Sequence, residues 1–220
     1  MTGRVKEKVY PYRVGFSTAM SRQFAIDRNR AGKGAFFLEY LNSAGHRPEE
    51  IALSSGKWGK SLERHVQEEF GHTLGVRVFC EQLPDINNSI TLNTSEKDYF
   101  GNPVPNISCG IGEYERGALK EATDVAKTIL QSAGAIDIQT GNLRYASHQI
   151  GTHRMGKDSR SSVVDENLCA HDIPNLYLVG SGSFVTSSAS PPTLTIAALA
   201  IKTSEHIASL QWSGQNPVSH

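Results

Sequence analysis

The chain has little of what marks a disulfide-rich, membrane-spanning or nucleic-acid-binding protein. Only three of its 220 residues are cysteine, and Cys80, Cys109 and Cys169 lie far apart without a CxxC spacing. This pattern predicts buried thiols rather than a disulfide framework or a zinc site. No stretch approaches about 18 consecutive apolar residues, so we expect no transmembrane helix. Lys+Arg and Asp+Glu both number 22, which gives no reason to expect a nucleic-acid or anionic-membrane partner.

Two glycine-containing segments fall short of well-known catalytic motifs. Gly110-Ile-Gly112 precedes a predicted helix, but Glu115 stands where a dinucleotide-binding fingerprint needs its third glycine, so we interpret the segment as a plain loop. Gly180-Ser-Gly-Ser183 lacks the Gly-x-Ser-x-Gly spacing of a serine nucleophile elbow. A hydrolase that uses Ser181 or Ser183 stays open as an alternative.

Metal ligands and targeting signals are equally sparse. The histidines at 148, 153 and 171 match no common zinc spacing, and HExxH is absent, so no metal site is predicted. The basic start of the chain is followed by no apolar segment, so no secretory signal is predicted and the compartment stays open.

Periodicity and turn residues predict a mixed α and β chain. Helices are expected at 60–70 and 115–133, each ended by a glycine. Strands are expected at 76–82 and 89–93, paired antiparallel, with a third at 107–109 and a strand-like run at 175–179. The short apolar run at 35–41 fits a buried strand or a helix edge. A C-terminal helix with a buried apolar body is expected to begin at the prolines 191–192.

The stretch from Ser147 to Ile207 holds the densest set of chemically demanding residues. His148 precedes the turn at Gly151-Thr152, where glycine lets backbone approach a ligand closely. The helix that follows Pro191-Pro192 presents unpaired N–H groups and its positive dipole end at its start. Together these features indicate one small-molecule site.

Several longer motifs occur here in a recognisable order. They are Glu81-Gln-Leu-Pro-Asp-x-x-Asn-Ser-Ile-Thr-Leu92, Asp98-Tyr-Phe-Gly-Asn-Pro-Val-Pro105, His148-x-x-Gly-Thr-x-Arg-Met-Gly156, Ser162-Val-Val-Asp165, His171-Asp-x-Pro-Asn-Leu-Tyr-Leu-Val-Gly-Ser181 and Pro192-Thr-Leu-Thr-Ile-Ala-Ala-Leu-Ala200. In this order they resemble the C-terminal part of the glucose–methanol–choline (GMC) family of FAD-dependent alcohol oxidoreductases. The resemblance is nearest to the branch that oxidises sugars, gluconate and polyols.

The resemblance implies an α+β fold. Residues 1–140 are expected to form part of a substrate-binding domain with an antiparallel sheet and flanking helices. Residues 141–220 are expected to be the C-terminal strand-helix segment that completes a Rossmann-like FAD-binding domain. The N-terminal part of that domain, with its glycine fingerprint, is absent from this sequence, so a separate N-terminal FAD-binding segment or subunit is an expected partner.

The resemblance also implies roles for five residues. His148 matches the base that takes the alcohol proton while hydride passes to FAD, and an imidazole titrates in the range that this role needs. Gly180 and Ser181 match positions beside the FAD phosphates and ribityl chain. Pro192 and Thr193 match the segment beside the flavin's pyrimidine edge. The implied substrate is a small alcohol, sugar, sugar acid or polyol that carries a CH–OH group.

One residue departs from the family pattern. The family places Asn or His immediately before the Pro-Thr pair, whereas this chain has Pro191, whose side chain makes no hydrogen bond. His148 then acts alone, or Ser188 or Ser190 substitutes. A non-catalytic remnant, or a partner-dependent subunit of a split enzyme, is the alternative function.

Overall fold

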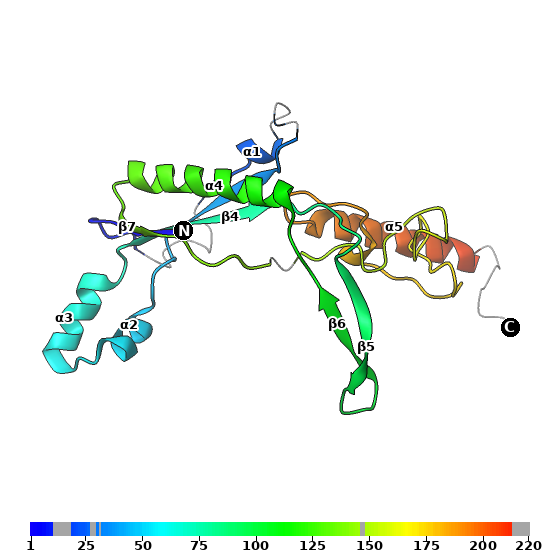
Figure 1. Ribbon diagram of the computed structural model, residues 1–220, viewed down its shortest axis with the longest axis horizontal. Helices are drawn as coiled ribbons and strands as arrows, with labels where there is room; N and C mark the ends of the chain where they lie inside the picture. The colour runs from blue at the N-terminus through cyan, green and yellow to red at the C-terminus, as the bar shows by residue number, and fades with distance from the viewer. Residues whose placement is uncertain (11–18, 27–29, 31, 146–147, 213–220) are drawn as a thin grey trace. The chain divides into compact units, whose positions relative to one another are not determined.

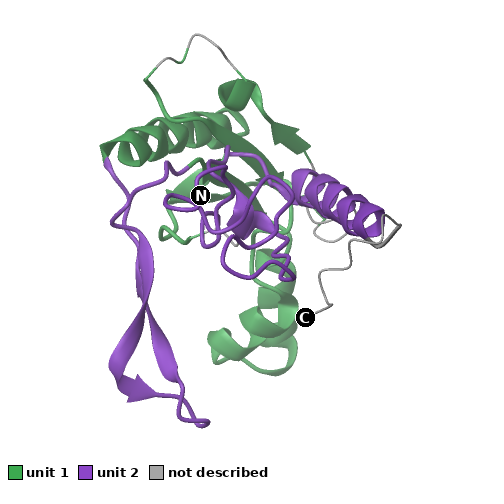
Figure 2. Ribbon diagram, turned by 90° about the vertical axis from the view of Figure 1, so that its right-hand side faces the viewer, with its two compact units in different colours: residues 1–81, 113–145 green, residues 82–112, 146–220 purple. Residues whose placement is uncertain are grey.

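The computed structural model describes residues 1–10, 19–26, 30, 32–145 and 148–212, so Ser147 of the dense stretch lies outside the described residues. The chain divides into two compact units (Figure 2), which we describe separately. Unit 1 comprises residues 1–81 and 113–145, and unit 2 comprises residues 82–112 and 146–220. The division into a substrate-binding part (1–140) and a flavin-site part (141–220) is a functional assignment and stays a prediction.

Unit 1 is built on a five-stranded antiparallel sheet in the order β2-β3-β4-β1-β7. The strands are β1 (Thr2–Arg4), β2 (Ala19–Ser21), β3 (Phe36–Leu41), β4 (Thr73–Cys80) and β7 (Ile136–Gln139). The helices are α1 (Gln23–Ile26), α2 (Pro48–Ser55), α3 (Gly59–Glu69) and α4 (Glu113–Ser132). The apolar run at 35–41 is therefore a strand, and the two predicted helices are confirmed with slightly different ends.

The core of unit 1 lies between the sheet and α4, the long green helix of Figure 1. Small residues at four-residue spacing, Ala118, Ala122 and Ala126, are buried on one stripe of α4. Their size lets the helix approach Phe36 and Leu38 of β3 closely. Gly134, with a φ of 74°, ends the following turn, as its position in the sequence predicted.

Unit 2 begins with a two-stranded antiparallel ribbon of β5 (Ser89–Lys97) and β6 (Pro103–Ser108) (Figure 1). The predicted pairing of the strand at 76–82 with the strand at 89–93 is wrong. Both edges of β4 are already paired, with β3 on one side and β1 on the other, so β5 pairs with β6 instead. Gly110 forms a plain loop, as predicted, and its N–H and C=O are held by the Asn88 side chain.

The rest of unit 2 is mostly irregular. It contains a short 3-10 helix, η1 (Ser181–Ser183), and the C-terminal helix α5 (Thr193–Trp212). The strand expected at 175–179 does not form, and only Tyr177 makes an isolated bridge, to Cys169. Leu168, next to Cys169, adopts a left-handed φ of 64°, which is not a strand conformation, and the pairing is limited to two backbone hydrogen bonds, from Ala170 N to the Leu176 carbonyl and from Leu178 N to the Leu168 carbonyl.

Helix α5 departs from expectation in its burial. Its apolar body was expected to be buried, but Leu194 is 84% exposed and Ile201 is 61% exposed. Thr203 is buried, and its hydroxyl donates a 3.1 Å hydrogen bond to the carbonyl of Asn167. Unit 2 thus covers one stripe of α5 and leaves other apolar side chains of this helix in solvent. The prediction of buried thiols is wrong as well, because Cys80 and Cys169 are half-buried and Cys109 is exposed.

The α+β class with antiparallel sheets is confirmed. No helix within the described residues is sufficiently long and apolar to cross a membrane.

Candidate functional site

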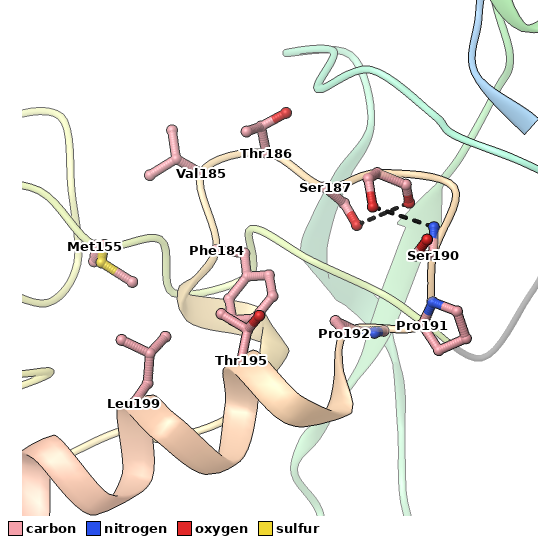
Figure 3. Close-up of a pocket in the computed structure, with 11 residues that line it drawn as sticks. Met155, Phe184, Val185, Thr186, Ser187, Ser190, Pro191, Pro192, Thr195 and Leu199 are labelled. Atoms are coloured by element: carbon pink, nitrogen blue, oxygen red, sulfur yellow. Dashed lines mark hydrogen bonds between the residues drawn. The ribbon is translucent and has the colours of Figure 1, made fainter. Parts of the chain in front are cut away.

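A cavity of about 500 Å³ opens at the start of α5, and every residue that lines it belongs to unit 2 (Figure 3). Five hydroxyl-bearing residues line it: Thr186, Ser187, Ser188, Ser190 and Thr195. The apolar part of the wall consists of Met155, Phe184, Val185, Pro191, Pro192 and Leu199. This volume and this mixture of apolar surface with a few polar groups are typical of small-molecule sites.

The loop before α5 is held by its own serines. The Ser190 N–H donates to Ser188 Oγ at 3.1 Å, and Ser187 Oγ donates to the carbonyl of Ser188 at 3.3 Å (Figure 3). Pro191 and Pro192 follow, and their rings fix φ close to the value that a first helical turn needs. The first α-helical bond, from Ile196 N to the Pro192 carbonyl, is 3.0 Å long. The sequence therefore builds a rigid entry into α5 at the cavity wall.

The 3-10 helix η1 positions a further part of the cavity wall, which includes Phe184 and Met155. Gly180 precedes η1 with a φ of 121° and a ψ of 179°, a conformation that is essentially restricted to glycine. The Ser183 hydroxyl donates to the Gly180 carbonyl at 2.8 Å, and Phe184 N donates to the Ser181 carbonyl at 3.0 Å. Met155 N bonds the Ser183 carbonyl at 2.8 Å. These contacts place Phe184 and Met155 in the cavity wall.

Of the five site residues predicted from the sequence, Pro192 alone lines this cavity. Thr193 is the exposed first residue of α5, directly after that wall. Gly180 and Ser181 are half-buried at η1, which positions Phe184. His148 is exposed in a segment without regular secondary structure and does not contribute to the cavity wall. The structure thus brings the α5 and η1 positions to one region of unit 2, and His148 lies outside that wall.

His153 is packed tightly against Gly182. A Cβ atom added to Gly182 would lie 2.2 Å from His153 Cε1, so only glycine fits there. His153 Nδ1 lies 3.2 Å from Thr152 Oγ1, while its Nε2 is buried without a hydrogen-bond partner among the described residues. Burial lowers the pKa of His153, which favours the neutral ring.

His171 has a structural position. Its Nε2 lies 2.9 Å from Ser162 Oγ and 3.2 Å from the carbonyl of Gly156, so the ring ties two loops together. The Ser162 hydroxyl itself donates to the carbonyl of Asp158 at 2.7 Å. Because both groups are committed to backbone carbonyls, this Ser–His contact does not form an activated nucleophile.

Among the described residues, neither Ser181 nor Ser183 has a general base that could activate it as a hydrolase nucleophile. Ser183 is fully buried and its proton is engaged by the Gly180 carbonyl. Within the described part of the chain, no His, Asp or Glu side chain hydrogen-bonds to Ser181 or Ser183. The described residues likewise contain no group of three His, Cys, Asp or Glu side chains that could hold a metal ion.

The region around the cavity has groups that suit a flavin. The first turn of α5 presents N–H groups without intrahelical acceptors, which complement electron-rich or anionic ring atoms. A Cβ built on Gly180 would meet nothing within 4 Å, so its backbone faces open space that a ligand can approach. Gly180 and the helix start after Pro192 are therefore compatible with a bound flavin, and their role as cofactor-binding positions stays a prediction.

The structure shows a mixed α+β fold with a cavity at a proline-initiated helix, a kind of place where small molecules bind. Comparison with known sequences identifies the family, because residues 84–200 match the GMC oxidoreductase family. The chain belongs to this family of flavoproteins.

Similar proteins include dehydrogenases and oxidases. The chain is 33% identical to the fructose dehydrogenase large subunit of Gluconobacter japonicus over 81% of this chain and 33% of that protein. It is 31% identical to the 2-methyl-1,2-propanediol dehydrogenase of Mycolicibacterium austroafricanum, over 84% of this chain and 34% of that protein. It is 33% identical to the paromamine 6'-oxidase of Streptomyces fradiae, over 61% of this chain and 25% of that protein. The chain spans about a third of the length of the first two relatives.

The residues of the cavity wall lie within the stretch 147–207 that was singled out in the sequence, and Ser188 and Ser190 were named as possible polar partners, but no motif indicated that they line one cavity. The hydroxyl-rich loop from Thr186 to Ser190 carries no catalytic spacing, and single Ser and Thr residues are commonest in ordinary loops. The available signal was its position directly before Pro191, since a polar loop that leads into a helix N-terminus often faces a ligand.

Proposed function

We propose that this chain supplies the substrate-side and helix α5 part of an FAD-dependent oxidoreductase that acts on a CH–OH group of a sugar, sugar acid or polyol. The observation that carries the proposal is the cavity at the start of α5, which lies within the family-matched residues and contains Pro192. The names of the fructose and propanediol dehydrogenases support an alcohol or sugar as the substrate.

In this proposal His148 removes the hydroxyl proton. Its exposure leaves the imidazole accessible to a substrate, and a positioned base of this kind accelerates proton transfer by about 100- to 10,000-fold. Bound FAD supplies the hydride acceptor. Gly180 and Ser181 would hold the phosphate and ribityl side of FAD, and Pro192 and Thr193 at the α5 N-terminus would hold its pyrimidine edge.

The apolar wall of the cavity has a second task. Phe184 is 9% exposed and Pro192 is buried, so this side of the site removes water from the reacting groups. Water exclusion strengthens the hydrogen bonds and charges that act on the substrate. The chain spans about a third of the length of the first two relatives, and in this proposal a further FAD-binding segment or subunit completes the cofactor site.

The proposed function is tested by rapid-mixing flavin reduction. In the flavin-loaded protein, His148→Ala should slow single-turnover reduction by an alcohol about 100-fold or more. His46→Ala is the matched control, because His46 is an exposed histidine of unit 1 with a side chain 83% exposed, and it should leave the rate unchanged. An unchanged rate in His148→Ala would remove the base assignment, and a protein that stays colourless after reconstitution with FAD would remove the flavin assignment.

A further inference from the structure

Resting on the proposed function, we propose that His153 is a positioning residue for the reaction, which holds the segment that carries His148 against η1. This segment comprises residues 148–155, and its first residues, 148–150, have no regular secondary structure. The place of His148 therefore depends on a few contacts further along the segment, and His153 provides several of them.

The His153 ring fills the space beside Gly182, a buried residue of η1. A Cβ atom built on Gly182 would lie 2.2 Å from His153 Cε1, 2.4 Å from His153 Nδ1 and 2.4 Å from Thr152 Oγ1. Atoms in a well-packed interior do not come this close. The ring and the glycine therefore fit one another, and a larger residue in place of Gly182 would push the ring away from η1.

Backbone hydrogen bonds join the same two segments. The His153 N–H donates to the Gly182 carbonyl at 3.0 Å, and the Met155 N–H donates to the Ser183 carbonyl at 2.8 Å. Ser183 is fully buried, and its hydroxyl donates to the Gly180 carbonyl at 2.8 Å. The contact at His153 thus continues into the turn at Gly180, which the proposed function assigns to the cofactor.

The two histidines of the segment differ in exposure, because His148 is exposed and the His153 ring is packed on η1. His153 Nε2 is buried and has no hydrogen-bond partner within the described residues, and Nδ1 lies 3.2 Å from Thr152 Oγ1. A general base must come within hydrogen-bond distance of the proton that it removes. Since Nε2 is buried and Nδ1 is engaged, His153 does not act as a second base, and its role is to place the chain.

The chain from His153 back to His148 is short and passes the cavity wall. A Cβ atom on Gly151 would lie 3.9 Å from the carbonyl oxygen of Phe184, so the backbone of Gly151 runs beside this wall residue. Three residues of extended chain span at most about 11 Å, which limits the distance between His148 and Gly151. Releasing His153 from η1 would release this stretch as well, and misplacing a reacting group by about 1 Å can cost about 100-fold in rate.

The structural part of the inference is tested without a cofactor. Amide hydrogen exchange of Met155 reports on its backbone bond to η1, and it should become at least about tenfold faster in His153→Ala. The Leu178 amide, which donates to the Leu168 carbonyl at 2.9 Å, is the internal reference, and its continued protection shows that the variant is folded. Backbone NMR relaxation should show lower order at residues 148–151 in the same variant.

The functional part is tested by single-turnover flavin reduction in the flavin-loaded protein. His153→Ala should slow reduction at saturating alcohol about tenfold or more, because the base is misplaced. The apparent dissociation constant of the alcohol should change by less than about threefold, because no substrate contact is removed. His153→Asn keeps a planar polar group beside Gly182 and should restore the rate to within about threefold.

His206→Ala is the matched control for the histidine variants. His206 is a half-buried histidine of α5 whose ring lies 6.2 Å from that of Tyr177. Its replacement should leave both the rate of flavin reduction and the exchange of the Met155 amide unchanged.

A pair of variants tests the contact itself. Gly182→Ala should also slow reduction, because its Cβ would collide with the His153 ring. The double variant His153→Ala/Gly182→Ala should be no slower than His153→Ala, since the ring is gone and the exposed Thr152 side chain can rotate away. Two independent tenfold effects would instead multiply to about 100-fold.

The outcomes separate this inference from the proposed function. Unchanged exchange of Met155 in His153→Ala, an unchanged reduction rate in that variant, or multiplied effects in the double variant would each overturn the positioning role. Absence of flavin reduction in the unaltered protein would overturn the oxidoreductase proposal. Lower order at residues 148–151 in His153→Ala would then still support the positioning of this segment, and unchanged order would overturn it.

Discussion

Unit 1 and the cavity-bearing part of unit 2 are stabilised in different ways. In unit 1, five strands pair along continuous ladders and α4 covers one face of the sheet. In unit 2, residues 153–184 form isolated bridges, such as the one between Met155 and Val164, and one short 3-10 helix, η1. The regular unit distributes its stability over many equivalent backbone bonds and apolar contacts, whereas the irregular segment depends on a few specific residues.

Those few residues in unit 2 are polar or conformationally unusual. Asp165 accepts the N–H groups of Asn167 and Cys169 at 2.8 and 2.9 Å, which closes a turn around the buried Leu168. Gly180 supplies a backbone conformation that other residues avoid. Substitutions should therefore act through apolar volume in unit 1 and through backbone conformation in unit 2.

The largest effect is expected in the core of unit 1. Leu130→Ala should lower the free energy of unfolding by about 3 kcal/mol, because Leu130 is 2% exposed and its loss leaves a cavity against the sheet. Leu53→Ala is the matched control, since Leu53 is 87% exposed on α2, and its effect should stay within about 0.5 kcal/mol. Denaturant unfolding measures both. Equal effects at the two sites would contradict the view that apolar volume holds unit 1 together.

A smaller effect is expected at the backbone of unit 2. Gly180→Ala should destabilise by about 2 kcal/mol, because alanine at a φ of 121° is strained. Gly117→Ala is the control, because an added Cβ meets nothing within 4 Å at either glycine and only the backbone conformation differs. Gly117 lies inside α4, so its replacement should stabilise by about 0.5 to 1 kcal/mol. Melting temperatures that shift in the same direction would refute the assigned difference.

The same contrast explains how much was predictable from sequence. The helix at 115–133 was predicted from its apolar periodicity, and α4 buries Ala122, Ala126 and Leu130 because one helix face meets one sheet face in a regular core. The pairing of β4 was missed, because strand neighbours depend on contacts with β1, which is distant in sequence.

In unit 2 the motif order indicated the family, and the family match confirms it. The sequence named Ser188 and Ser190, which line the cavity, but not Thr195, whose place in the wall depends on the three-dimensional course of the chain. The failed strand at 175–179 has the same origin, since a left-handed Leu168 in the partner segment is not encoded in the pattern of the strand itself.

The smallest effect concerns charge in unit 1 and has a defined pH window. Arg30 binds both carboxylate oxygens of Glu121, at 2.7 and 3.0 Å, and this pairing lowers the pKa of Glu121. A carboxyl group with a lowered pKa in the folded state stabilises the protein above its unfolded-state pKa, and this contribution is lost as pH falls through the folded-state pKa. Glu121→Gln should therefore cost about 1 kcal/mol at pH 7, and the difference from the unaltered protein should shrink steadily below about pH 4.5. Unfolding free energies measured from pH 7 to pH 3 test this, with Glu63→Gln on the exposed surface of α3 as the control. A difference that stays constant with pH would show that Glu121 acts, like Leu130, through packing, and would leave apolar volume as the common basis of stability in unit 1.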